Sequence, residues 1–247
     1  MSVQIIQDEC IQCQMCVAEC PSQCLSLQDG QIAFNAKSCI SCGHCFAICP
    51  KGAITLNSFT AAQAEALSSN SALESKIINR RSIRSFKSDP LPHTVLNELI
   101  QLTRFAPSAR NTRLTQFVVI GRKTMNQIGE QVAVMIHPKM GAIQKVKDIV
   151  FRGAPHVIVA IAPESATEMQ KMDGQIAVSE LEIALPDEIG SFWCGFLIGA
   201  AQKNPEIRKQ MNLPEGFTVV ASLGVGTKDI QYARPVIREN IPVQWIE

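Results

Sequence analysis

The chain has 247 residues, of which 46% are hydrophobic, so it is long and apolar enough to form the cores of one or two domains. Its formal net charge of +1 at pH 7 lacks the electrostatic footprint of a protein that binds nucleic acid or an anionic membrane surface. The first residues show no signal peptide, and no window approaches the roughly 20 apolar residues of a membrane span. We therefore expect a cytoplasmic protein without nucleic-acid or membrane partners.

Eight cysteines in two runs of identical spacing dominate the first 57 residues. In each run the gaps are two, two and three residues, and a proline follows the last cysteine. The runs are Cys10, Cys13, Cys16 and Cys20, and then Cys39, Cys42, Cys45 and Cys49. The repeat indicates a duplicated ligand set. Three thiolates spaced two residues apart can bind three iron atoms of a 4Fe-4S cluster, while the fourth ligand comes from elsewhere. We therefore predict two 4Fe-4S clusters.

Residues 1–57 resemble a bacterial two-cluster ferredoxin, in which the last cysteine of each run binds the cluster of the other run. The resemblance implies that one cluster is bound by Cys10, Cys13, Cys16 and Cys49, and the other by Cys39, Cys42, Cys45 and Cys20. Zinc is a weaker alternative. Paired C-x-x-C units also form zinc sites, but a repeated triplet of cysteines followed by Cys-Pro is not the spacing of a zinc ribbon. Disulfides are weaker still, since nothing indicates secretion. The remaining Cys24 is expected to be a small buried residue.

Two short strands are expected around the cysteine loops, at 3–6 and 31–34, with a turn at Asp29 and Gly30 between them. From residue 58 the sequence becomes rich in alanine, serine and glutamine. Residues 61–67 favour a helix, and Ser68 to Ser71 favour a break. We therefore expect a ferredoxin domain at 1–57, a linker at 58–76 and a second domain at 77–247.

The second domain begins with an arginine-rich segment that could bind a phosphate, although such a cluster alone is more often a solvated basic face. An amphipathic helix is predicted from Thr94 to Leu102 by its apolar stripe, with Pro92 near its start. Strands are predicted at 116–120, at 154–161 and at 217–225. The second of these is a continuous apolar run, which is typical of a strand covered on both faces.

Four segments of this domain resemble motifs of the FMN-dependent nitroreductase family. They are Arg80–Arg84, Ala106–Asn111, Gly190–Gly195 and Leu213–Gly216. The resemblance covers residues 77–247 and implies an α+β fold, in which helices flank a central, mainly antiparallel sheet. It also implies a homodimer with FMN at the subunit interface. One departure from the family is Pro186, followed by two acidic residues, and we expect it to end the preceding helix early.

The resemblance also implies FMN-binding roles for individual residues. The phosphate and the ribityl chain would be held by Arg80, Arg81, Ser82 and Arg84. The flavin of the partner subunit would be approached by Pro107, Ser108, Ala109 and Asn111. The reactive edge of the flavin would lie near Pro214, Glu215 and Gly216. A basic tail would complete the phosphate site through Arg234 or Arg238, with Arg234 preferred and Lys228 as a substitute. No side chain is expected to act as a catalytic acid or base, because the flavin would carry the chemistry.

The two halves together resemble ferredoxin-nitroreductase fusion proteins, which implies a direction of electron flow. An external low-potential donor, such as a ferredoxin, would reduce the clusters, which would pass single electrons to FMN. The reduced flavin would then reduce a nitroaromatic, a quinone or an activated alkene. Two alternatives stay open. In one, NAD(P)H reduces FMN and the clusters feed a partner protein; in the other, the chain is a non-catalytic electron-transfer or flavin-storage module.

Overall fold

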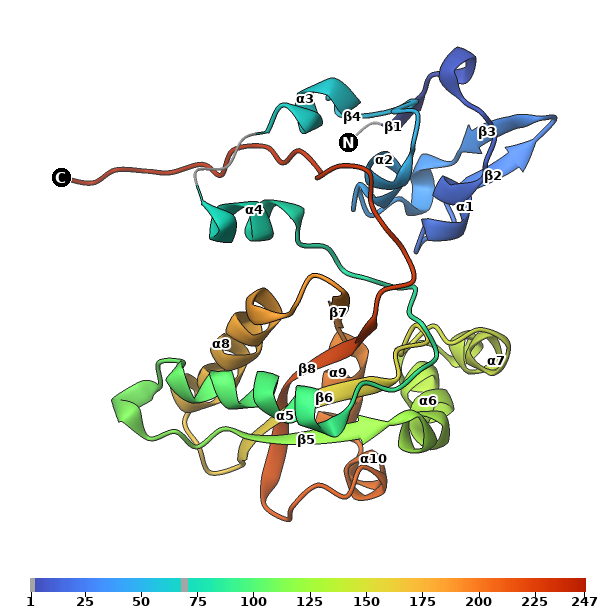
Figure 1. The fold of residues 1–247 in the computed structure, drawn as a ribbon. Coiled ribbons are helices and arrows are strands. Elements are labelled where there is room, and N and C mark those ends of the chain that lie inside the picture. The colour runs from blue at the N-terminus through green and yellow to red at the C-terminus, as the bar shows by residue number, and fades with distance from the viewer. Residues whose placement is uncertain (1–2, 68–70) are drawn as a thin grey trace. The chain divides into compact units, whose positions relative to one another are not determined.

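The structure, a computed structural model, describes residues 3–67 and 71–247 and divides the chain into two compact units (Figure 1). The first unit comprises Met1–Arg80 and Gln231–Glu247, and the second comprises Arg81–Ile230. The C-terminal segment 231–247, which we expected in the second domain, therefore belongs to the first unit. None of the helices in the described residues combines the length and the apolar character that a membrane crossing requires.

Two small antiparallel sheets form the frame of the first unit. They pair β1 with β4 and β2 with β3, which span Val3–Ile5, Ile54–Leu56, Leu25–Gln28 and Gln31–Phe34. The hairpin between β2 and β3 turns at Asp29 and Gly30, whose φ angles of 48° and 76° are those that a type I′ turn requires. The predicted strands and their turn are confirmed.

Two short helices of the first unit repeat one local structure. Helix α1 (Met15–Glu19) and helix α2 (His44–Ile48) each begin directly after a residue in the left-handed conformation, Gln14 with φ 59° and Gly43 with φ 73°. Each of these residues follows the second cysteine of its run. The duplicated spacing of the cysteines therefore has a duplicated backbone beneath it. The core under the helices is small and contains Ile32, Phe46, Ile48, Ile54 and Leu56.

One helix lies within the expected linker at 58–76, and a second begins in it and runs beyond its end. Helix α3 (Ala61–Glu65) begins with a capping box, in which the side chains of Thr60 and Gln63 each accept from the backbone N–H of the other residue. Helix α4 (Ala72–Asn79) begins after Ser71, whose hydroxyl accepts from the N–H of Glu74. The break predicted at Ser68 to Ser71 lies, except for Ser71, outside the described residues.

A four-stranded antiparallel sheet forms the centre of the second unit, in the order β5-β6-β8-β7. This confirms the mainly antiparallel sheet. The strands span Gln116–Gly121, His156–Pro163, Ile189–Trp193 and Phe217–Thr227, for β5 to β8 in chain order. Figure 1 shows the long β8 in the interior of the sheet beside β6.

Helices cover both faces of this sheet, because β6 contributes alternate side chains to two hydrophobic cores. Val157 and Val159 pack in one core with α6 and α9, and Ile158 and Ala160 pack in the other with α5 and α8. Every residue from His156 to Ala162 is buried, which confirms the strand predicted to be covered on both faces. The helices α5 to α10 span His93–Leu102, Arg122–Ile136, Pro138–Val146, Glu168–Ala184, Gly195–Lys203 and Pro205–Gln210.

Prolines set two of the helix boundaries. Helix α5 begins directly after Pro92 and buries Leu96 and Leu99, as its apolar stripe predicts. Helix α8 ends two residues before Pro186, and Leu185 between them has left the helical conformation with ψ 137°. A residue before proline avoids the helical region because its backbone would clash with the ring. The predicted early end of this helix is confirmed.

Candidate cofactor-binding sites

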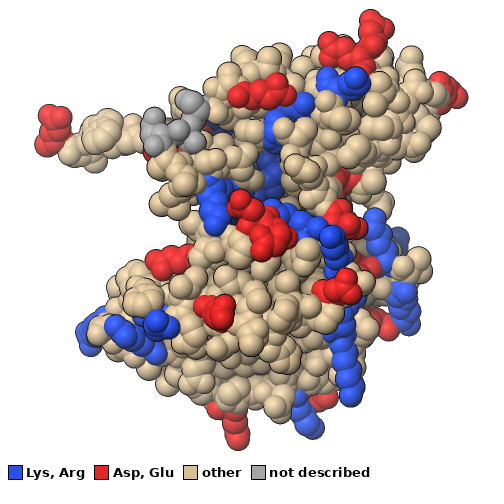
Figure 2. All heavy atoms as spheres, viewed as in Figure 1, with Lys and Arg blue, Asp and Glu red and all other residues tan. Residues whose placement is uncertain are grey.

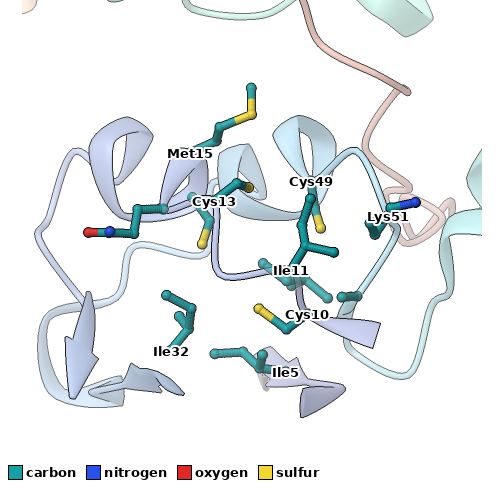
Figure 3. A pocket seen from close by; sticks show the side chains of 12 residues that line it. Ile5, Cys10, Ile11, Cys13, Met15, Ile32, Cys49 and Lys51 are labelled. Atoms are coloured by element: carbon teal, nitrogen blue, oxygen red, sulfur yellow. The ribbon is translucent and has the colours of Figure 1, made fainter. Parts of the chain in front are cut away.

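Four thiols from both cysteine runs surround one cavity in the first unit, as Figure 3 shows for Cys10, Cys13 and Cys49. Cys16, at the start of α1, is the fourth. Most of the remaining wall of the cavity is apolar, with Ile5, Ile11, Ile32 and Ile54. The structure thus brings together the four cysteines that the ferredoxin resemblance assigns to one cluster.

The other four predicted ligands surround a second cavity, and they are Cys20, Cys39, Cys42 and Cys45. Two backbone N–H groups donate to sulfur here, from Cys24 to Cys20 Sγ at 3.2 Å and from Ser41 to Cys39 Sγ at 3.4 Å. Such hydrogen bonds tune the potential of a thiolate-bound cluster. Cys24 is 4% exposed, as expected for a buried residue, and it also lines this cavity.

Burial and neighbouring thiols raise the pKa of two of the predicted ligands. Burial raises the pKa of the Cys16 thiol to about 11, and the neighbouring Cys49, Cys10 and Cys13 raise it too. Burial likewise raises the pKa of Cys45 to about 12, with Cys42 as the next cause. A bound metal cation reverses this balance and deprotonates a coordinating thiol. None of the ten cysteines forms a disulfide.

The spacing of the thiols fits a cluster better than a single ion. Among the residues that the structure describes, no three His, Cys, Asp or Glu side chains lie close enough together to share one metal ion. A zinc site would need four ligands around one ion. Each of the two cavities instead has four thiols on its wall, the number of ligands that a 4Fe-4S cluster takes.

The predicted phosphate-binding segment of the second unit lies beside β7, an edge strand of the central sheet. Ser82 forms a parallel bridge with Ser191 of β7, and the N–H of Ile83 donates to the Ser191 carbonyl at 2.7 Å. A Cβ at Gly190 would lie only 2.6 Å from Ile83 Cγ1. Gly190 is therefore needed for the close approach of this segment to β7.

The same segment also contacts the end of β8. Phe86 forms a bridge with Lys228, and the N–H of Lys87 donates to the Thr227 carbonyl at 3.0 Å. Lys228, the substitute in our sequence assignment of the phosphate site, therefore belongs to the same unit as Ser82 and lies beside the segment that carries it.

Arginines gather beside this segment, and the sequence analysis did not identify one of them. Arg81 is 9% exposed. Burial lowers the pKa of Arg152, and the charge of Arg84 is the next cause, so these two guanidinium groups are near each other. A bound phosphate would relieve the repulsion between these two positive charges. Arg152 belongs to no motif or periodic pattern in the sequence. Arg80 is exposed and is the last residue of the first unit's N-terminal part.

A buried carboxylate, also missed in the sequence analysis, holds the middle and the end of β7. Glu182 of α8 is 8% exposed and accepts from the Ser191 hydroxyl at 2.9 Å and from Trp193 Nε1 at 3.0 Å. Because Ser191 also contacts Ser82 and Ile83, Glu182 supports the phosphate-binding segment indirectly. Its spacing in the helix was a usable signal, since residues 178, 181 and 185 of the same face are buried too.

The loop that we expected to approach the flavin of the partner subunit lies at the other end of the sheet. There the N–H of Ala109 donates to both carboxylate oxygens of Asp173, each at 3.1 Å. Pro107 and Ser108 line a cavity together with Arg104, Arg113 and others. Figure 2 shows basic side chains gathered at this loop between α5 and β5. Asn111 ends the short 3-10 turn that begins at Ala109.

The segment Pro214, Glu215 and Gly216 is far from the phosphate-binding segment of the same chain. It immediately precedes Phe217, the first residue of β8, whereas Ser82 bridges to Ser191, which pairs with Val225. Eight residue-to-residue steps of extended strand lead from Phe217 to Val225, which is about 26 Å at roughly 3.3 Å per step. An extended strand thus keeps Glu215 and Gly216 apart from Ser82 of the same chain, and their contact with the reactive edge of a flavin stays a prediction.

The two arginines of the basic tail are engaged in the first unit. Arg234 donates to the carbonyls of Phe46 and Cys49 and pairs with Glu65 at 3.0 Å. Arg238 donates to the Cys42 carbonyl at 3.4 Å. Both arginines therefore have partners among the cysteine loops of the first unit, and their role at the phosphate site stays a prediction. The tail follows the last strand in the sequence, but its side chains bind the cysteine loops.

Comparisons with known proteins agree with the two-unit architecture. A sequence profile described as the nitroreductase family matches residues 77–227, and one described as a 4Fe-4S dicluster domain matches residues 9–61. The chain is 24% identical over 193 residues to YfhC of Bacillus subtilis (strain 168), whose name describes an NAD(P)H nitroreductase. That similarity covers 74% of this chain and 96% of YfhC.

Solved structures share the fold of the second unit. Nitroreductases with bound FMN from Bacteroides fragilis and Desulfitobacterium hafniense both superpose with a TM-score of 0.60, at 17% and 19% identity. Each covers 72% of this chain and 100% of its own. An FMN-dependent nitroreductase of Clostridium difficile R20291 superposes with a TM-score of 0.56 at 21% identity, over 71% of this chain and 100% of its own.

The second unit thus has the fold of a nitroreductase, and the chain belongs to the nitroreductase family. The protein is an FMN-dependent oxidoreductase. Since a 4Fe-4S domain precedes the nitroreductase domain, it is more specifically a ferredoxin-nitroreductase fusion, as the motifs in its sequence predict.

Proposed function

We propose that the protein is a homodimer that takes electrons from an external low-potential donor, such as a ferredoxin, and reduces an organic acceptor at FMN. The electrons pass through two 4Fe-4S clusters, and the acceptor is a nitroaromatic, a quinone or an activated alkene. The observation that carries this proposal is the pair of four-cysteine cavities on the same chain as a nitroreductase domain. Iron-sulfur clusters carry single electrons, whereas FMN accepts one or two and can deliver a hydride equivalent.

The cysteines of the first unit have a binding role in this proposal. One cluster is held by Cys10, Cys13, Cys16 and Cys49, and the other by Cys20, Cys39, Cys42 and Cys45. Apolar side chains in the cavity walls limit the access of water. We place the protein in the cytoplasm, because cluster-binding thiols must be kept reduced and the cytoplasm is a reducing compartment.

Residues beside β7, in the central sheet of the second unit, hold FMN. Arg81, Ser82 and Arg84 bind the phosphate and the ribityl chain, and Arg152 and Lys228 add positive charge. The loop with Pro107, Ser108, Ala109 and Asn111 lies at the opposite end of the sheet, so it serves the flavin of the partner subunit. A two-fold dimer can bring such distant segments together at one interface. A mass of twice the chain in light scattering would support this dimer, and a monomer that still binds FMN would contradict it.

The double covalent connection between the two units supports a transfer of electrons within the chain. The chain enters the second unit at Arg81 and leaves it at Ile230. These points are near each other, since Phe86 pairs with Lys228 and the N–H of Asp229 donates to the Ser85 carbonyl at 3.1 Å. Both connections therefore start beside the segment proposed to hold FMN. Tethering raises the effective concentration of one redox unit at the other.

One alternative is favoured by a specific observation. YfhC is named as an NAD(P)H nitroreductase. NAD(P)H could accordingly reduce FMN here, with the clusters then feeding a protein acceptor.

An anaerobic titration of the reconstituted protein separates the two directions. We expect reduced ferredoxin to bleach the absorbance of the clusters and of the flavin, and a nitroaromatic or a quinone to restore it. If NADH or NADPH reduces the flavin first and the clusters follow, the alternative direction is correct. If no acceptor reoxidises the flavin, the protein is an electron-transfer or flavin-storage module.

A further inference from the structure

The C-terminal segment binds along the cysteine loops of the first unit, and we call residues 232–239 the C-terminal strap. The Tyr232 hydroxyl donates to a Glu19 carboxylate oxygen at 2.6 Å. Val236 is 6% exposed and packs so closely on Gly43 that a Cβ there would lie 2.8 Å from both of its γ-carbons. The strap therefore packs against both the α1 and the α2 halves of the unit.

Arg234 is the most buried charged side chain of the strap. Its side chain is 4% exposed. One guanidinium nitrogen donates to the Cys49 carbonyl at 2.5 Å and to the Phe46 carbonyl at 3.2 Å. These carbonyls lie at the C-terminal end of α2, where the last carbonyls of a helix lack helical partners and the helix dipole is negative. Arg234 thus places a buried positive charge on the helix end that carries Cys49.

The position of Cys49 makes this charge important for a bound cluster. The Cys49 thiol lines the first cavity with Cys10, Cys13 and Cys16. The residue after Cys49 is a proline, so the peptide bond between them has no N–H to donate toward sulfur. The guanidinium of Arg234 supplies positive charge and hydrogen bonding on the carbonyl side of that peptide instead.

We propose that Arg234 raises the reduction potential of the cluster held by Cys10, Cys13, Cys16 and Cys49. Reduction adds negative charge to a thiolate-bound cluster, whose potential depends on net charge, hydrogen bonding and burial. A charge withdrawn from water acts through a lower effective dielectric constant than an exposed one. The partner carboxylate of Glu65 is 57% exposed, so water screens it and it offsets only part of the Arg234 charge.

This inference rests on the clusters of the proposed function and adds a residue that tunes one of them. Arg234 is here a positioning residue, since it acts through the backbone of Cys49. Because the strap follows directly from the nitroreductase domain, the tuning group comes from the far end of the sequence, beyond that domain.

The test is a redox titration of the full-length reconstituted protein, with dithionite as reductant and the reduced clusters followed by electron paramagnetic resonance. In Arg234→Gln we expect one midpoint potential to become more negative. The equilibrium constant for reduction of that cluster should fall on the order of tenfold, which is about 59 mV for one electron. In Glu65→Gln, which removes the opposing charge, we expect a shift in the opposite direction. Arg234→Lys should restore much of the wild-type potential.

Arg238→Gln is the matched control. Arg238 belongs to the same strap and donates to the carbonyl of a predicted ligand, Cys42, at 3.4 Å, but its side chain is exposed. Because an exposed charge is screened, its removal should shift a midpoint by much less than Arg234→Gln does. A shift in Arg238→Gln as large as that in Arg234→Gln would overturn the inference.

Two further results would overturn it. One is an Arg234→Gln protein that binds the wild-type amounts of iron and sulfide and has unchanged midpoints. The other applies if Arg234→Gln does not retain its clusters. In that case an unchanged midpoint potential in Glu65→Gln overturns the inference. A wild-type protein that binds no cluster after reconstitution would instead contradict the proposed function itself. Iron content therefore separates the two failures.

Discussion

At the scale of single residues, His156 illustrates how burial couples a side chain to pH. It is 6% exposed at the start of β6, and its Nε2 has no hydrogen-bond partner among the described residues. Burial lowers its pKa below 6.5, the charge of His93 lowers it further, and a hydrogen bond with the Leu91 backbone acts in the opposite direction. The unfolded chain therefore binds a proton more readily than the folded chain does.

This makes the second unit less stable in mild acid. Between the lowered pKa and 6.5 the unfolded state holds more protons, so stability rises with pH across that window and is lost as the pH falls. One proton gives a slope of at most about 1.4 kcal/mol per pH unit. We expect the midpoint temperature of flavin release to fall from pH 7.5 to pH 5.5 in the wild type and to fall less in His156→Gln. Parallel curves for the two proteins would contradict this assignment.

At the scale of elements, α8 supports the FMN-binding segment through β7. Glu182 accepts two hydrogen bonds from β7, and β7 in turn pairs with the segment that carries Ser82. Leaving a buried donor without its partner costs about 1–3 kcal/mol. A change at Glu182 should therefore displace a segment that it does not touch.

We expect Glu182→Ala to weaken FMN binding about 5-fold to 150-fold, which corresponds to a loss of about 1–3 kcal/mol. Flavin fluorescence quenching during titration of the apoprotein with FMN measures this. Glu180→Gln is the matched control, because Glu180 lies on the exposed face of the same helix. Equal FMN affinity in Glu182→Ala and Glu180→Gln would show that β7 does not need the buried carboxylate.

At the scale of the whole molecule, the two units depend on different sources of stability. The second unit has two hydrophobic cores on the faces of one sheet. The first unit has short strands, a small core and buried thiols whose pKa values are raised by burial and by one another. Small domains of this kind draw their folding free energy from the bound metal.

Removing iron should therefore unfold one unit and spare the other. We expect anaerobic chelation to remove the hydrogen-exchange protection of residues 3–56 and of the C-terminal strap, while the amides of β5 to β8 stay protected. Mass spectrometry of peptides after exchange, with and without chelator, measures this. Continued protection of α1 and α2 after complete loss of iron would mean that the first unit folds without its clusters.

Much of the fold could be predicted because its signals are local. The β2–β3 turn, the end of α8 before Pro186 and the buried strand β6 each follow from the conformational limits or the periodicity of neighbouring residues. Glu182 and Asp173 also lie at buried positions of α8, so the spacing of these acids could have identified them. Arg152 could not be found in this way, since its relation to Arg84 depends on how separate segments pack.

The sequence by itself determined the chemistry of the protein: two sets of thiols, a phosphate-binding segment and the family motifs around it. Only the tertiary structure decided where the chain's ends and loops lie. It placed Arg234 on the helix end beside Cys49, and it placed Glu215 at the opposite end of β8 from Ser82. The physical reason is that spacing reports which residues share a face or a turn. The partners that a segment meets across the fold depend on long-range packing.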